Sequence, residues 1–314
     1  MRISLWISTD NTWTDIRSLA LHAEATGWDG IWVADHFMGD DAGFGAADSP
    51  TLEATAVLST LAAITRRLRI GPLVLGATYR HPAVVAKWAV TTDRIAAECS
   101  DDAHTGRLVL GLGAGWQQNE HDQYGIELPT VRDRVSRFGE YCHVITSLLG
   151  ATPADFDGDW FHLEGALCEP KAIRSSGRPG GIPIMIGGKG DRMLGVAARY
   201  GDEWNMWGLP ERIAERAEVL DQTCVAIGRD PATVARSAQA LLLPTADDAE
   251  ARRFVEAVAP RAAVAGPVER IGETVGRWAE VGVTEVIVPD SPLGRGAQRA
   301  EHLDALAEVF APYR

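Results

Sequence analysis

The sequence predicts an α/β fold, a (β/α)8 barrel of the TIM type with insertions, and three observations support this. Short apolar runs rich in β-branched residues alternate with longer stretches of helical period along the 314 residues. The alternation gives eight strand–helix units without a break in composition. Polar and reactive side chains follow several of the strands, where the active sites of such barrels lie. We therefore expect a single barrel domain over residues 1–314.

The expected strands are short runs rich in Val, Ile, Leu and Trp, a composition typical of strands. They are residues 3–7, 30–35, 68–75, 107–115, 182–188, 203–207, 236–243 and 284–290.

The expected helices follow these strands and are residues 12–26, 49–65, 81–97, 131–149, 190–200 and 210–227, with a last helix ending near Phe310. In the second of them, Ser49 is expected to be the N-cap, with Pro50 at the first helical position. Three stretches do not fit the alternation and are interpreted as insertions. Residues 116–130 and 150–181 are rich in Gly, Pro, Asp and aromatic residues, and residues 246–260 predict an extra helix.

Composition excludes several classes of protein. The net charge of −13 and a pI near 5.1 are unlike the basic surface that a nucleic-acid-binding protein needs. The four cysteines contain no C-x-x-C pair, and no motif for metal catalysis is present, so no metal is expected. No apolar run approaches the length of a membrane span. We expect a cytoplasmic protein that acts on a small molecule, without a nucleic-acid or membrane partner.

The triplet Asp35-His36-Phe37 directly follows the second strand. A histidine there can donate or accept a proton near neutral pH, and an adjacent carboxylate can set its tautomer. Histidines at strand ends also serve as packed or capping residues. The position at the catalytic rim makes His36 a candidate active-site residue, and both interpretations stay open on the triplet alone.

Two glycine-rich segments also follow strands. Residues 111–115 have the spacing G-x-G-x-G rather than the G-x-G-x-x-G of dinucleotide-binding folds, so they indicate either a tight turn or close approach of the backbone to a flat ring. Gly187-Gly188-Lys189 lies between a strand and a helix, where free backbone N–H groups can bind a phosphate. A flexible turn is the alternative there.

Tryptophans gather near the predicted strand ends, among them Trp6, Trp116, Trp204 and Trp207. A flat aromatic ligand would suit such a lining, although aromatic residues in a strand are also common in a core.

Several of these segments together resemble the luciferase-like monooxygenase superfamily, in particular its F420-dependent branch. The resemblance covers most of the chain in order: VADHF (33–37), YRHPAVVAKWAVTTD (79–93), GRLVLGLGAGWQQNEHDQYGIELP (106–129), IPIMIGGKGDRMLGVAARYGDEWN (182–205), CVAIGRDP (224–231) and GPVERIGETVGRWAEVGV (266–283).

The resemblance implies a barrel that binds coenzyme F420 or FMN at the carboxyl ends of its strands. His36 matches the active-site histidine, with Asp35 beside it. A non-proline cis peptide that backs the cofactor ring is implied at Leu73-Val74, Gly113 is expected near the ring, and Gly187, Gly188 and Lys189 match the phosphate loop. Relatives often dimerise through barrel helices, so a homodimer is expected by analogy.

Two departures from the family bear on the substrate. The sugar-phosphate dehydrogenases of this superfamily have a catalytic Glu where this chain has Trp116, and a Trp where it has Asp40. Their substrate is therefore not carried over. Trp116, Glu120 and Trp207 are expected to shape the substrate pocket.

These observations lead to one expected function and two alternatives. We expect an F420-dependent oxidoreductase that transfers a hydride between C5 of the deazaflavin and a small organic substrate, with His36 carrying the accompanying proton. The first alternative is an FMN-dependent monooxygenase on the same barrel. The second is a non-catalytic barrel that binds a flavin or deazaflavin.

Overall fold

The computed structural model describes residues 1–43, 45–102, 105–173 and 181–314, and a nearly closed barrel of parallel strands lies at its centre. The barrel strands are β1 (Arg2–Ile7), β2 (Gly30–Val33), β3 (Arg69–Pro72), β4 (Leu75–Gly76), β5 (Leu110–Gly113), β8 (Ile184–Gly187), β9 (Glu203–Trp207), β10 (Ala235–Gln239) and β13 (Glu285–Pro289). Their order around the barrel is β3-β2-β1-β13-β10-β9-β8-β5-β4. Because β3 and β4 are two halves of one interrupted strand, the nine strands occupy eight strand positions, or staves, of the barrel. The predicted barrel is confirmed.

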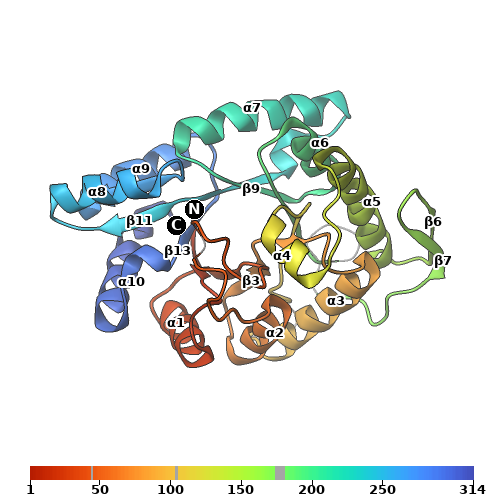
Figure 1. Cartoon of the computed structure of the whole chain (residues 1–314), viewed down its shortest axis with the longest axis horizontal. Coiled ribbons are helices and arrows are strands. Elements are labelled where there is room, and N and C mark those ends of the chain that lie inside the picture. The colour runs from red at the N-terminus through yellow and green to blue at the C-terminus, as the bar shows by residue number, and fades with distance from the viewer. Residues whose placement is uncertain (44, 103–104, 174–180) are drawn as a thin grey trace.

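A ring of helices covers the outside of the barrel (Figure 1). They are α1 (Trp13–Ala25), α2 (Ala54–Ile64), α3 (Pro82–Glu98), α5 (Val131–Leu149), α6 (Asp191–Tyr200), α7 (Pro210–Ala226), α9 (Val268–Glu280) and α10 (Gly296–Phe310). Each presents apolar side chains to the strands; Leu58, Phe138 and Trp278, for example, are fully buried. The main core therefore lies between helices and barrel, and a smaller cluster that includes Trp32, Val109 and Met185 fills the barrel interior.

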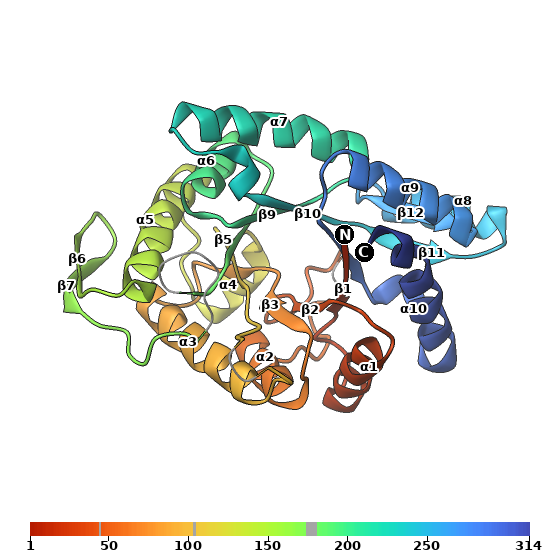
Figure 2. The same ribbon diagram turned by 180° about the vertical axis from the view of Figure 1, so that it is seen from behind.

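The three insertions extend from the ring of helices at separate places. The helix α4 (Gln118–Tyr124) lies in the insertion of residues 116–130. In the second, β6 (Ala154–Asp157) and β7 (His162–Ala166) form an antiparallel hairpin, while residues 174–180 of that insertion lie outside the described residues. The third contains α8 (Asp248–Val258), beside a two-stranded parallel sheet of β11 (Leu241–Pro244) and β12 (Ala263–Gly266). Figure 2 shows the hairpin and this sheet on opposite sides of the molecule.

The single strand expected over residues 236–243 is wrong. β10 stays in the barrel between β9 and β13, whereas β11 leaves it and pairs with β12. The segment contains no Gly, Pro, Asn or Asp, so its sequence has no turn signal at the place where the chain changes sheets. Neither β12 nor α9 was expected from the sequence.

The expected start of the second helix is also wrong. Helix α2 begins at Ala54, and its cap is Glu53, whose carboxylate accepts a hydrogen bond of 2.7 Å from the amide of Ala56. Ser49 and Pro50 lie before it in a loop, because Glu53 is also anchored by an ion pair with Arg80.

The strand expected over residues 68–75 is interrupted at Leu73-Val74, where the peptide bond is cis. The position that the resemblance implied for this bond is confirmed.

Charged residues fill the amino-terminal end of the barrel. Glu285 is fully buried and receives hydrogen bonds from Arg2, Ser4, Trp32 and Arg69. This ionic cluster fills the amino-terminal end of the barrel. None of the helices in the described ranges is long and apolar enough to cross a membrane.

Candidate active site

A cavity of about 1030 Å³ opens at the carboxyl ends of the barrel strands, the end at which we expected the site. Its size is at the upper end of the ~300–1,000 Å³ that small-molecule and cofactor sites occupy. Of the residues singled out from the sequence, those that line it are Trp6, Asp35, His36, Leu73, Val74, Gly113, Gly115, Trp116, Gly187, Gly188, Lys189 and Trp207.

His36 is held by Glu120. Its side chain is 18% exposed, and its Nδ1 lies 2.8 Å from Oε1 of Glu120. The other carboxylate oxygen of Glu120 accepts the backbone N–H of Phe37 at 2.8 Å. Glu120, which was expected to help shape the substrate pocket, is on α4, is fully buried and is not among the residues that line the cavity. It lies behind His36.

Three hydrogen bonds keep Glu120 ionised. The hydroxyl of Tyr79 also donates to its Oε1. Burial favours the neutral acid, but the hydrogen bonds from His36 and Tyr79 and the amide of Phe37 outweigh burial and hold the pKa of Glu120 below its ordinary value of 4.5. An ionised Glu120 makes Nδ1 of His36 the donor, which assigns the tautomer from the network. The Nε2 edge of the ring is then the one that can meet a molecule in the cavity.

Asp35, the carboxylate next to His36 in the chain, has different partners. Arg80 donates to both of its oxygens, at 2.7 and 2.9 Å, and the amide of Gly76 donates at 3.0 Å. Burial raises the pKa of Asp35, and Arg80 and Gly76 act in the opposite direction. Glu120 rather than Asp35 therefore orients His36, while the bridge to Arg80 joins the loops after the second and third staves.

Glycines keep the floor of the cavity flat around Val74. A Cβ atom on Gly113 would lie 2.6 Å from Cγ2 of Val74, and one on Gly187 would lie 3.1 Å from its Cγ1. Any larger residue at Gly113 would displace the Val74 side chain. A planar ring can thus lie against Leu73 and Val74.

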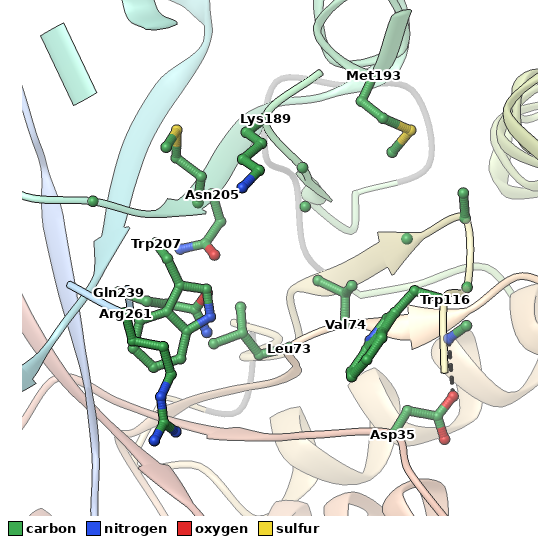
Figure 3. Close-up of a pocket in the computed structure, with 18 of the residues that line it drawn as sticks. Asp35, Leu73, Val74, Trp116, Lys189, Met193, Asn205, Trp207, Gln239 and Arg261 are labelled. Atoms are coloured by element: carbon green, nitrogen blue, oxygen red, sulfur yellow. Dashed lines mark hydrogen bonds between the residues drawn. The ribbon is translucent and has the colours of Figure 1, made fainter. Parts of the chain in front are cut away.

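The loop after β8 can bind an anion. Gly188 has φ of +145°, and Gly190 is the N-cap of α6 without a side-chain hydrogen bond to the first turn. The indole N–H of Trp204 fixes this loop by donating to the carbonyl of Gly188 at 2.7 Å. Lys189 extends from the loop toward the cavity near Asn205 (Figure 3). Helix-terminal N–H groups and a lysine together suit a phosphate.

Aromatic residues form the mouth and the far wall. Trp116 is 51% exposed at the mouth, and its ring meets that of His36 edge-on, with centroids 5.4 Å apart. On the far wall, Trp6 and Trp207 make an edge-on pair with centroids 5.7 Å apart. Gln239 and Arg261 complete that wall beside Trp207 (Figure 3).

Tyr79, Arg80, Gln239 and Arg261 belong to this site and were not expected there from the sequence. Tyr79 and Arg80 follow the third strand, so their place at a strand end was a usable signal. Gln239 was hidden inside an expected strand. Arg261 had no signal, because the sheet that positions it was not expected.

Two curated proteins share sequence with this chain. The chain is 31% identical over 200 residues to 4-hydroxyprotoasukamycin monooxygenase of Streptomyces nodosus subsp. asukaensis, a match that covers 64% of this chain and 48% of that protein. It is 31% identical over 189 residues to the F420-dependent glucose-6-phosphate dehydrogenase of Amycolatopsis mediterranei, covering 60% and 51%. These matches thus span about half the length of the curated relatives.

A solved structure has the same fold over its full length. It is an F420-dependent secondary alcohol dehydrogenase in complex with an F420-acetone adduct, with a TM-score of 0.83 and 20% identity, covering 100% of this chain and 99% of that one. The family model described as luciferase-like monooxygenase matches residues 1–309. With its barrel, its cis peptide and its glycine loop, the chain belongs to the luciferase-like monooxygenase family.

Proposed function

We propose that the protein is an F420-dependent oxidoreductase that transfers a hydride between the deazaflavin and a small organic substrate. One observation supports this above the others. His36 lies in the cavity wall with its Nδ1 bound to a buried, ionised carboxylate, so that Nε2 can exchange a proton with a molecule in the cavity. Two relatives that carry F420 dependence in their names, from different organisms, add to it.

The cavity fits a deazaflavin in two respects. The flat surface at Leu73 and Val74, kept open by Gly113, suits a planar ring, and the loop of Gly187, Gly188 and Lys189 suits an anionic tail. When bound, the cofactor would supply the carbon that accepts or donates the hydride.

The residues of this chain then have separate roles. The floor and the glycine loop would hold and orient the cofactor, and Trp116 would limit entry of water at the mouth. His36 would accept at Nε2 the proton of a hydroxyl group as the hydride leaves the adjacent carbon, and would return it in the reverse reaction. Glu120 would stabilise the imidazolium that forms, as a carboxylate beside a catalytic histidine does.

A binding experiment tests the choice of cofactor. Trp6, Trp116 and Trp207 line the cavity, so their fluorescence should be quenched when F420 is added to the cofactor-free protein. FMN is titrated in parallel. Quenching by FMN without any response to F420 would contradict the proposal and favour an FMN-dependent monooxygenase; one relative is named a monooxygenase.

A variant tests the role of His36. His36→Ala is expected to lower turnover by about 10²–10⁴-fold while the affinity for F420 changes little, because the ring carries the proton and does not hold the cofactor. His162→Ala, on the exposed hairpin, is the matched control. Equal losses of turnover and cofactor affinity in the His36 variant would refute this role. Binding of F420 without turnover over a broad substrate panel would favour a non-catalytic barrel.

A further inference from the structure

The far wall of the cavity has donors that the cofactor site does not use. The residues that would hold the cofactor lie on one side of the barrel: between β3 and β4, at the end of β5, and at and after the end of β8. On the other side, Trp207 and Gln239 are the last residues of β9 and β10, and Trp6 is the last but one of β1. Gln239 and Trp207 are register partners in adjacent strands, and the Trp6 ring packs against Trp207. We call Gln239, Arg261, Trp6 and Trp207 the far-wall cluster.

Gln239 is a buried amide that faces the cavity. Its residue is 6% exposed, it lines the cavity, and no hydrogen bond of its side chain is found within the described residues. The Gln239 amide is not one of the fully enclosed polar groups that lack a partner, so it is accessible from the cavity. Its N–H and C=O groups can therefore form hydrogen bonds with a molecule bound there.

Arg261 brings a positive charge to the same wall. The amide of Leu241 donates to the carbonyl of Ala262 at 2.9 Å, which places the Arg261 segment alongside the end of β10. One guanidinium N–H donates to the carbonyl of Gly43 at 2.9 Å. Within the described residues Arg261 has no carboxylate partner, so its remaining donors are available to an anion.

The wall has no negative charge to oppose an anion. Asp35 is the one carboxylate among the described residues that line the cavity, and Arg80 neutralises it. We propose that the far-wall cluster binds an oxyanion of the substrate, a carboxylate or a phosphate, through Arg261 and Gln239, while Trp6 and Trp207 contact its apolar body. The substrate would thus be a small organic acid bearing an apolar group. This proposal rests on the proposed function, because it assigns the glycine loop to the cofactor.

Binding of three probes tests the proposal. Phenylacetate, phenyl phosphate and the neutral 2-phenylethanol are titrated into the protein with and without F420, and tryptophan fluorescence and calorimetry report binding. We expect at least one of the acids to bind more tightly than the alcohol, and the two acids distinguish a carboxylate site from a phosphate site. Equal affinity of alcohol and acids, or no binding of either acid, would overturn the proposal.

Two variants locate the anion. Arg261→Gln should weaken the bound acid by about tenfold to a hundredfold, because a hydrogen-bonded charge is lost. Gln239→Glu should weaken it as well, through repulsion, without touching the contact of Arg261 with Gly43. Arg253→Gln, on the exposed face of α8, is the matched control and should leave binding unchanged. Unchanged acid affinity in both wall variants would overturn the proposal.

The affinity for F420 separates the two ends of the cavity. Arg261→Gln should leave it unchanged, whereas Lys189→Gln should lower it. Loss of F420 affinity in Arg261→Gln, with acid binding intact, would mean that the far wall holds the cofactor and would overturn the proposal. If the protein binds FMN instead of F420 and acid binding still depends on Arg261, the proposed function is contradicted. The acid site at the far wall is supported in that case.

Discussion

The protonation state of Glu120 determines how His36 is held, since the carboxylate is fully buried and accepts hydrogen bonds from His36, Tyr79 and the amide of Phe37. The folded-state pKa of Glu120 lies below its ordinary value of 4.5. Its charge therefore contributes stability above about pH 4.5, and this contribution is lost as the pH falls through the folded-state pKa.

Glu120→Gln should accordingly cost about 1.5–3 kcal/mol of unfolding free energy at pH 7, the usual contribution of hydrogen bonds to a charged group. The difference from the wild type should shrink below pH 4.5, and urea denaturation at both pH values measures it. Turnover should fall on the order of a hundredfold through misplacement of the imidazole. Glu120→Asp should recover part of the turnover. A stability difference that grew with acidity would contradict the assigned charge.

Trp116 should control access and contribute little to stability. About half of the Trp116 surface is exposed to solvent. Trp116→Ala should therefore change the free energy of unfolding by no more than about 0.5 kcal/mol. Removal of the indole widens the mouth, so the ratio of kcat/KM for bulky to small substrates should rise, while F420 affinity stays the same. Trp160→Ala, on the exposed hairpin loop, serves as control. An unaltered preference between substrates would show that Trp116 does not border the substrate.

At the scale of elements, Gly113 in β5 leaves room for the Val74 side chain in the cavity floor, where we propose that the cofactor ring lies. In Gly113→Ala the new methyl group would press on Val74, and overpacking of this kind costs about 1–3 kcal/mol. F420 affinity should fall with it. Gly139→Ala provides the contrast, because a Cβ there meets nothing within 4 Å and the position is inside α5, so it should stabilise by roughly 0.5–1 kcal/mol. Thermal denaturation of both variants checks the opposite signs.

The elements also explain what could be predicted from the sequence. The β-branched runs and helical periods were enough for the eight staves, because a buried parallel strand and an amphipathic helix leave different patterns. The change of sheet between Gln239 and Leu241 has no such pattern in the sequence, since both sheets bury the same kind of residue. His36 and the glycine loop stand at strand ends and could be found there. Glu120 could not be assigned to His36, because that contact joins residues 84 positions apart.

At the scale of the whole molecule, the two ends of the barrel have separate tasks. The amino-terminal end is closed by the ionic cluster around Glu285, and the carboxyl-terminal end holds the cavity. Removal of one partner from a buried ion pair typically costs about 3–5 kcal/mol. Arg69→Met should therefore lower the free energy of unfolding by about that amount, since it leaves Glu285 and Glu203 without their shared cation.

The same variant should leave the cavity intact. In the folded protein, F420 affinity of Arg69→Met is expected to equal that of the wild type, and titration well below the unfolding temperature measures it. A large loss of affinity would mean that the two ends are coupled. Arg66→Met is the control, as its ion pair lies on the surface and should contribute little.

The small sheet of β11 and β12 has a consequence for how such enzymes diversify. It leads from Arg261 at the cavity and shares no hydrogen-bonded ladder with the described barrel strands. Changes of length or sequence there need not disturb the floor or the glycine loop. If the far-wall cluster selects the substrate as we propose, exchange of this one peripheral segment would change the substrate and leave the barrel as it is.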